Sequence, residues 1–216
     1  MILELEDVYY RYKKNSPYIL NGVTYGFDKG KLYAIMGESG SGKTTLISII
    51  AALDRPTGGR ICYDGEDIAG LNADAYRAKC VSVIFQGYNL LYNYTARDNI
   101  TTVLNVSGYR GDYGRRAEEL LGEVDISAEK RGYVVQNLSG GEQQRVAIAR
   151  AVAANSEVIL ADEPTGNLDR TNGERVMEIF KGLMAKYGKC VIIVTHSDLI
   201  AAYADCVLKI EGGKIK

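Results

Sequence analysis

Four short, mainly apolar runs are spaced along the chain. They are Leu32–Met36, Val81–Phe85, Val158–Ala161 and Val191–Val194. Runs of four or five residues rich in branched side chains are typical of strands buried on both faces of a parallel sheet. Segments with apolar residues every three to four positions lie between them, for example Thr44–Leu53 and Glu174–Met184, and predict helices. The pattern predicts an α/β fold.

The N-terminal part of the chain has a different pattern. Leu3 and Leu5 alternate with Glu4 and Glu6, as in a strand with one buried face. A second strand pattern surrounds residues 60–63 and ends at Asp64-Gly65, a pair typical of a tight hairpin turn. These segments predict an antiparallel β layer beside the parallel sheet.

The middle of the chain, from about residue 88 to residue 154, contains no strand-like run. Its sequence predicts helices and loops, with Ala117–Leu121 as one helical segment. We therefore expect a single domain over residues 1–216 with an α-helical subdomain inserted at about residues 88–154.

Composition narrows the class of protein. The 216 residues are 46% apolar and 25% charged, as in average globular proteins, which excludes wholesale disorder. The 26 basic and 27 acidic residues give a net charge of −1, so we expect no nucleic-acid partner. No apolar run reaches the ~18–20 residues of a membrane span, and the first seven residues are acidic, unlike a signal peptide. These features predict a soluble chain that stays in the cytoplasm.

The cysteines and the histidine do not predict a zinc site. Cys62, Cys80, Cys190 and Cys206 lie far apart, and His196 is the only histidine. Zinc sites need clustered Cys and His ligands. Three of the four cysteines are in or beside strand-like runs, where they are expected to pack as small apolar side chains in a reducing compartment.

A glycine-rich segment follows the first buried run. Gly37–Thr44, GESGSGKT, matches the phosphate-loop pattern G-x-x-x-x-G-K-[ST] at every fixed position. It also lies between a predicted strand and a predicted helix, the context that this motif requires. The glycines let backbone N–H groups surround a phosphate at a helix N-terminus. Lys43 is expected on the β- and γ-phosphates, and the Thr44 hydroxyl on Mg²⁺.

Two acidic residues end the third buried run. Asp162 lies at the carboxyl end of this predicted strand and is placed to hold Mg²⁺ through water. Glu163 follows immediately and is our candidate general base for the water that attacks the γ-phosphate. Alone, the pair would fit a solvated loop, but the upstream phosphate loop favours the functional interpretation.

A third motif precedes the last helix of the middle segment. In Leu138–Arg145, LSGGEQQR, Ser139 and Glu142 form a helix capping box. A cap does not require Gly140-Gly141, which weaken the first turn by about 1 kcal/mol each relative to alanine. The presence of two glycines is explained if a phosphate binds at this helix N-terminus, because residues without side chains let it approach the backbone closely.

Together, these motifs resemble those of ATP-binding cassette (ABC) proteins over essentially the whole chain. The set appears in the family's order, with Gln86 after the second buried run, Asn167–Asp169 after Glu163, and His196 after the fourth. Within the family, the sequence is most similar to the ATPase subunits of macrolide-export, lipoprotein-release and antimicrobial-peptide-resistance permeases. The phrases that carry this similarity are Leu53–Gly59, Phe85–Leu91 and Ala161–Asp169.

The resemblance implies a role for each matching position. Tyr12 would stack on adenine, although a surface tyrosine of a strand is the alternative. Gln86 would touch Mg²⁺ and the attacking water and would sense the membrane partner, and His196 would contact the γ-phosphate. Asp169 would cross a dimer interface, and Ser139 and Gly141 would bind the γ-phosphate of ATP held by the other subunit. The implied nucleotide-binding set is Tyr12, Gly37, Glu38, Ser39, Gly40, Ser41, Gly42, Lys43, Thr44, Thr45, Ser139, Gly141 and Asp169. Glu163, His196, Gln86 and Lys43 would be catalytic, and Thr44, Gln86 and Asp162 would hold the metal.

The function implied is an ATPase subunit that forms a head-to-tail homodimer around two ATP molecules with Mg²⁺. The dimer would drive a separate membrane permease at the inner face of the cell membrane. The alternative function is an ABC ATPase that regulates cell-wall hydrolases through a membrane partner without moving a substrate. A soluble ABC protein of DNA repair or ribosome function would need a long coiled coil or a second cassette, and an unrelated P-loop kinase would not need the Leu138–Arg145 motif. One departure is visible, because residues 133–137 lack the proline that relatives often carry.

Overall fold

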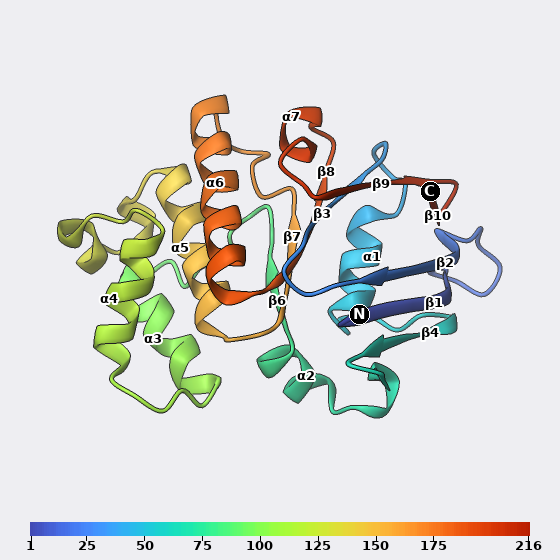
Figure 1. Ribbon diagram of the computed structural model, residues 1–216, viewed down its shortest axis with the longest axis horizontal. Helices are drawn as coiled ribbons and strands as arrows, with labels where there is room; N and C mark the ends of the chain where they lie inside the picture. Colours follow the sequence, from blue (N-terminus) through green and yellow to red (C-terminus); the bar gives the residue numbers. More distant parts are fainter.

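A six-stranded sheet crosses the centre of the computed structural model, which describes residues 1–216 (Figure 1). Its strand order is β10-β9-β3-β8-β7-β6, and every pairing is parallel except that between β9 and β10. The strands are β3 (Leu32–Met36), β6 (Val81–Ile84), β7 (Val158–Asp162), β8 (Cys190–Thr195), β9 (Cys206–Glu211) and β10 (Lys214–Ile215). The four apolar runs therefore form β3, β6, β7 and β8, as predicted.

The register of the parallel strands brings three loops together. Met36 at the end of β3 is paired with Thr195 at the end of β8, and Asp162 at the end of β7 is paired with Val194. The next residues along the chain, which begin the loops after these strands, consequently emerge at one edge of the sheet. This edge is where α/β proteins bind ligands.

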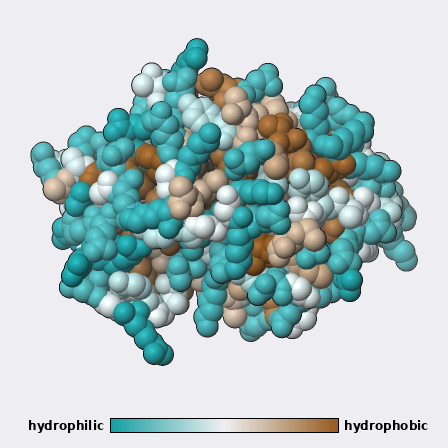
Figure 2. Space-filling view, viewed as in Figure 1, coloured by the Kyte–Doolittle hydropathy of each residue, from teal (hydrophilic) through white to brown (hydrophobic).

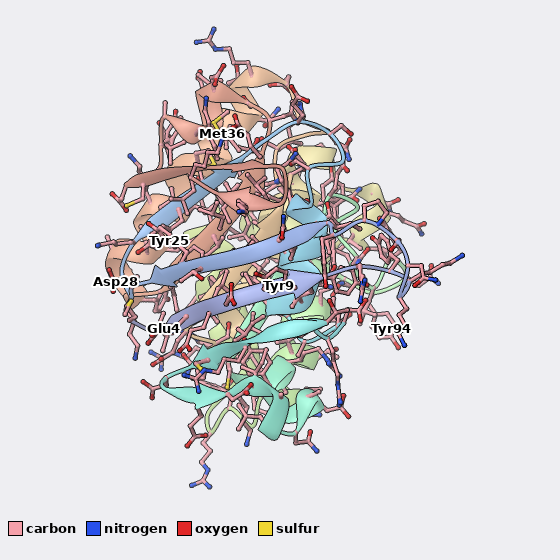
Figure 3. The ribbon with its side chains drawn as sticks, turned by 90° about the vertical axis from the view of Figure 1, so that its right-hand side faces the viewer. Glu4, Tyr9, Tyr25, Asp28, Met36 and Tyr94 are labelled. Atoms are coloured by element: carbon pink, nitrogen blue, oxygen red, sulfur yellow. The ribbon has the colours of Figure 1, made fainter.

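A second, antiparallel sheet has the order β2-β1-β4-β5 (Figure 3). It consists of β1 (Leu3–Tyr10), β2 (Leu20–Phe27), β4 (Gly58–Tyr63) and β5 (Glu66–Asp67). On β1, Leu3 and Leu5 are buried, whereas Glu4 and Glu6 are partly exposed. The turn between β4 and β5 has φ values of 49° at Asp64 and 82° at Gly65, which suit a tight hairpin. The predicted antiparallel layer is confirmed.

Helices bury both faces of the parallel sheet. Helix α1 (Lys43–Ile50) lies between the two sheets, and its buried residues share one apolar core with β1, β2, Leu160 and Ile192. Helices α5 (Gly140–Ala153) and α6 (Arg170–Tyr187) cover the opposite face and share a second core with Ile159 and Val191. Burial on both faces explains why these strands are continuous apolar runs.

The middle segment is helical, as the pattern predicted. It contains α3 (Ala96–Val106), α4 (Tyr113–Glu123), the 3₁₀ turns η2 (Ala128–Gly132) and η3 (Val135–Asn137), and α5. The remaining short helices are η1 (Ile68–Gly70), α2 (Ala73–Lys79) and α7 (Asp198–Ala201). The α/β fold class with a helical insertion is confirmed, and the division at residues 88–154 stays a prediction.

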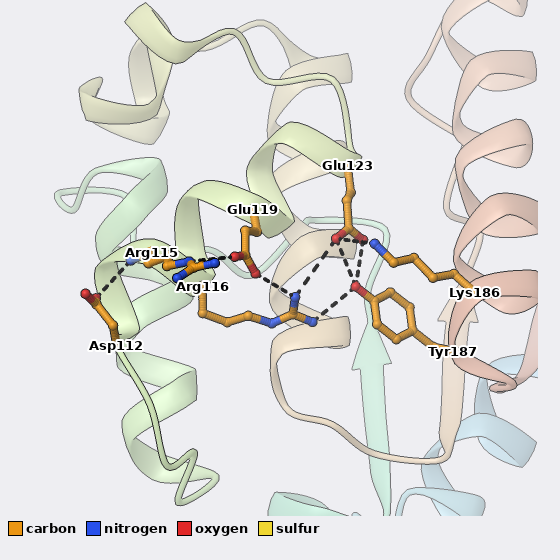
Figure 4. Close-up of polar contacts among 7 residues, drawn as sticks. All are labelled: Asp112, Arg115, Arg116, Glu119, Glu123, Lys186 and Tyr187. Carbon is orange, nitrogen blue, oxygen red and sulfur yellow. Dashed lines mark hydrogen bonds and ion pairs between the residues drawn. The ribbon is translucent and has the colours of Figure 1, made fainter.

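A polar network ties this segment to α6 (Figure 4). The Tyr187 hydroxyl donates to Glu123 at 2.8 Å and accepts from Arg116 at 3.1 Å. Lys186 forms an ion pair with Glu123 at 2.8 Å. The outer side of α4 carries the exposed pair Arg115–Glu119.

On the face seen in Figure 2, apolar side chains form small separate groups among hydrophilic ones. No helix of the chain is both long and apolar enough to span a bilayer.

The limits of two predicted helices need correction. The helix predicted over Thr44–Leu53 ends at Ile50, because Ala52 has φ 52° and turns the chain, and Leu53 is 51% exposed. The helix predicted over Glu174–Met184 is longer at both ends, since Asp169 caps it and Gly188, with φ 62°, ends it after Tyr187.

The four cysteines are free, and three of them lie in β4, β8 and β9.

Candidate nucleotide-binding site

The glycine-rich loop between β3 and α1 presents an open helix N-terminus. Gly40 and Gly42 have φ values of 80° and 103°, a region that favours glycine. Gly42 is the N-cap of α1, and no side chain caps this helix, whereas α2 to α6 each have a side-chain cap. The first N–H groups of α1 therefore lack side-chain acceptors, and the positive end of the helix dipole favours an anion there.

The interior of this loop is fitted to a phosphate group. Lys43 Nζ donates to the carbonyl oxygens of Gly37 at 2.7 Å and Glu38 at 2.9 Å, so the ammonium lies across the loop. The Ser41 hydroxyl is buried without a hydrogen-bond partner. A Cβ atom at Gly37 would lie 2.6 Å from that hydroxyl, so a larger residue would fill the loop. A buried unpaired hydroxyl and a central cation are what a phosphate would satisfy.

A cleft of about 400 Å³ brings most of the predicted site residues together. It is lined by Tyr12, Ile19, Ser39, Gly40, Gly42, Lys43, Thr44, Thr45, Asp162, Glu163 and His196. Tyr12 is 70% exposed and has its edge-to-face contact with Tyr10, at 5.4 Å between ring centroids. Gly37, Glu38 and Ser41 line an adjoining cleft of about 860 Å³ that shares Ser39, Gly40 and His196.

Asp162 and Thr44 supply oxygen atoms to the lining of the cleft. Burial raises the pKa of Asp162, and a hydrogen bond with the Thr44 hydroxyl opposes this rise. Nearby Glu163 raises the pKa further, and the Lys43 ammonium lowers it. A carboxylate and a hydroxyl are donors that Mg²⁺ uses beside nucleotide phosphates, so this pair fits the metal that the sequence predicts.

Glu163 and His196 form one hydrogen-bonded unit. His196 Nδ1 lies 2.8 Å from Glu163 Oε1, and because a carboxylate only accepts, the ring nitrogen carries the proton of this bond. The Glu163 side chain is 17% exposed, and its backbone has φ 47°, a left-handed conformation that is uncommon outside glycine. Strain of this kind collects at functional sites, where the surrounding structure fixes it.

Thr195 holds the other oxygen of Glu163 and was not singled out by any sequence pattern. Its buried hydroxyl donates to Glu163 Oε2 at 3.3 Å and accepts from Ser197 N at 3.1 Å. The residue therefore fixes the direction of the Glu163 carboxylate from β8.

Thr195→Val should lower kcat for ATP hydrolysis by about 2- to 10-fold, the effect of one hydrogen bond, with KM unchanged. Valine keeps the shape but cannot bond to Glu163. Thr195→Ser retains the hydroxyl and should remain near the wild-type rate. Steady-state kinetics of both variants check this, and equal losses in the two would contradict a role for the hydroxyl.

Four predicted site residues line neither of these two clefts. Gln86 packs against the loop after Glu163, because a Cβ atom at Gly166 would lie 3.3 Å from its Nε2, and Asn167 Nδ2 donates to its carbonyl oxygen at 3.2 Å. Ser139 caps α5 and, with Glu142, completes the predicted capping box. The other two are Gly141, which packs on Asn172, and Asp169, which caps α6. Within one chain, Ser139 and Gly141 therefore do not reach the nucleotide cleft.

Comparison with known proteins gives consistent matches. The family model described as "ABC transporter" matches residues 20–166. The lipoprotein-releasing system ATP-binding protein LolD 1 of Rhodopseudomonas palustris is 39% identical, covering 99% of this chain and 98% of that protein. An uncharacterized ABC transporter ATP-binding protein of Bacillus subtilis, YclH, is also 39% identical, with 98% and 94% covered. The macrolide export protein MacB of Shigella boydii is 42% identical over 99% of this chain but only 34% of its own length.

Solved structures agree with these sequence matches. A bacterial ABC transporter cassette described as dimeric superposes with a TM-score of 0.88 at 35% identity, covering 100% of this chain and 97% of that one. A second dimeric structure of that cassette, in a post-hydrolysis state bound to ADP and Pi, also has a TM-score of 0.88, at 34% identity and with the same coverage.

Proposed function

The chain belongs to the ABC transporter family as an ATP-binding cassette, and on that premise we propose that it hydrolyses ATP to drive a separate membrane permease. The observation that supports this most is the cleft itself. It combines a phosphate loop, Asp162 with Thr44, and the Glu163–His196 pair in about 400 Å³.

Two copies of the chain would complete each site. Ser139 and Gly141 lie on the N-terminal turn of α5, outside the cleft of their own chain. A head-to-tail dimer would present this turn to the nucleotide of the other subunit, and the similar cassette that forms a dimer supports this arrangement. Gly140-Gly141 would let the γ-phosphate approach the backbone N–H groups.

Each side chain in the cleft would have one task. Lys43 would hold the β- and γ-phosphates, and Tyr12 would offer its exposed face to the base. Glu163 would take the proton of the attacking water, with its carboxylate fixed by His196 and Thr195. Asp162 and Thr44 would hold Mg²⁺, and Gln86 would join them from the loop after β6. When bound, the ion would supply positive charge against the phosphates.

The permease would contact an apolar groove of about 330 Å³ next to Gln86. Its lining includes Leu53, Val83, Phe85, Val103 and Val106. Leu53 and Val106 are 51% and 68% exposed, so the groove presents contiguous apolar surface to solvent, as protein interaction sites do. Contact here would place the chain peripherally at the inner face of the membrane.

The substrate class that we propose is a lipoprotein, an antimicrobial peptide or a macrolide-like compound moved outward. The support is the similarity, at about 40% identity, to proteins named for lipoprotein release and macrolide export. Selectivity for the cargo would reside in the permease.

The shared-site arrangement is tested by the concentration dependence of hydrolysis. The rate per mole of purified chain, with ATP and Mg²⁺, should rise with protein concentration until the dimer is saturated. Phosphate release measured over a hundred-fold dilution series checks this. A rate per mole that stays constant while sedimentation shows only monomer would contradict the proposal.

A further inference from the structure

The loop that carries Gln86 is held by side chains from distant parts of the chain. Every carbonyl oxygen from residue 85 to residue 89 accepts a hydrogen bond. The donors are Tyr88 N to Phe85 O, Asn167 Nδ2 to Gln86 O, Asn89 N and Tyr92 Oη to Gly87 O, Arg150 Nη2 to Tyr88 O, and Arg150 Nη1 to Asn89 O. Two of these five carbonyls therefore depend on one guanidinium.

The part of the loop that Arg150 holds is also its strained part. Tyr88 and Asn89 have φ values of 61° and 50°, two consecutive left-handed residues that are not glycine. Tyrosine rarely adopts this conformation without outside support. Arg150 donates to the Tyr88 carbonyl at 3.0 Å and to the Asn89 carbonyl at 2.5 Å, and so stabilises both.

Arg150 is free to serve this loop alone. No carboxylate lies within ion-pair distance of it. Its planar, forked donor group matches two adjacent carbonyl oxygens, which a lysine ammonium cannot reproduce with the same geometry. Partial burial lowers the pKa of Arg150, as expected for a cation with no carboxylate beside it.

The same helix contacts the loop a second time. Arg150 lies in the last turn of α5, and Gly140 lies in its first turn. A Cβ atom at Gly140 would be 3.2 Å from the Tyr88 hydroxyl, so the Tyr88 side chain extends along α5. The loop that carries Gln86 therefore contacts α5 near both of its ends.

We propose that Arg150 is a positioning residue for ATP hydrolysis, which sets the pose of Gln86 by clamping the carbonyls of Tyr88 and Asn89 to α5. The inference rests on the proposed function, because it requires Gln86 to act in hydrolysis. Ser139 caps the same helix. The clamp would therefore connect the turn that binds the nucleotide of the other subunit with the Gln86 that acts at the nucleotide of its own chain.

A double-mutant cycle with Gln86 tests the inference on the full chain. Arg150→Lys should lower kcat about ten-fold with KM within about two-fold of wild type, as expected for a group that acts after ATP has bound. In a Gln86→Ala background, Arg150→Lys should lower kcat no further, because its effect passes through Gln86. Arg115→Lys is the matched control, since Arg115 lies on the exposed side of α4 and its guanidinium pairs only with Glu119 (Figure 4).

Hydrogen exchange separates this role from a loss of stability. Amide exchange at residues 85–92 should become about ten-fold faster in Arg150→Lys, with α5 unchanged and the melting temperature near that of wild type. Arg150→Gln, which keeps a planar amide, provides a second variant if lysine perturbs folding. Additive losses with Gln86→Ala, unchanged exchange in the loop or a normal kcat would each overturn the inference. A normal rate for Gln86→Ala alone would instead remove Gln86 from the proposed mechanism and the clamp's role with it.

Discussion

Glu163→Gln should reduce ATP turnover by about 10²- to 10⁴-fold, the usual contribution of a positioned general base. The amide cannot accept the proton of the attacking water, whereas the carboxylate can. The fold of the cleft should persist, because the amide oxygen can still accept from His196 Nδ1, which lies 2.8 Å from Glu163 Oε1 in the wild type. The amide N–H₂ can donate to the Thr195 hydroxyl in place of the bond that Glu163 Oε2 accepts.

The same substitution should trap an ATP-bound dimer. It removes a negative charge that faces the phosphates, which lowers Coulomb repulsion in the closed site. Size-exclusion chromatography with ATP at low salt should show a dimer for Glu163→Gln and mostly monomer for the wild type, and ADP should abolish the dimer. Glu174→Gln is the control, because Glu174 pairs with Arg170 on the exposed side of α6. A Glu163→Gln variant that hydrolyses ATP at the wild-type rate would move the general base elsewhere.

Lys43→Ala should lower ATP turnover by on the order of 10²- to 10³-fold, as expected when one charged donor to a developing anion is removed. The Lys43 ammonium is already held in the loop by the carbonyl oxygens of Gly37 and Glu38. Little conformational entropy is therefore lost in placing it when a phosphate binds. Without it, no other cation lines the cleft except the ring of His196 when protonated. Turnover and the binding of a fluorescent ATP analogue measure the loss, with Lys29→Ala, a surface partner of Glu157, as control. Substantial turnover in Lys43→Ala would remove the phosphate loop from the mechanism.

The parallel strands and the cleft motifs could be predicted because their signals are local. Burial on both faces requires continuous apolar runs, so β3 and β8 follow directly from the sequence. The phosphate loop is a short segment at a strand end that its own spacing identifies, and Asp162-Glu163, at another strand end, is recognised together with it. The parallel register then brings them to one edge, as Met36 and Thr195 show.

The remaining features depend on contacts between distant residues. Leu53 reads as the end of a helix, but its side chain lines the groove beyond the turn at Ala52. Thr195 contacts a residue 32 positions away, and Arg150 contacts carbonyls 61 and 62 positions away. Nothing in the neighbouring sequence of Arg150 distinguishes it from the arginines that only face solvent, so its partners emerge only from the packing of α5 against the Gln86 loop.

Mixing two inactive variants tests the shared site most directly. A dimer of Lys43→Ala with Ser139→Ala would have one site with both defects and one site with neither, because each site takes Lys43 from one chain and Ser139 from the other. An equal mixture should therefore regain about a quarter of the wild-type ATPase rate, since about half of the dimers are mixed and each has one intact site. A mixture that stays as inactive as its components, although mixed dimers form, would contradict the account.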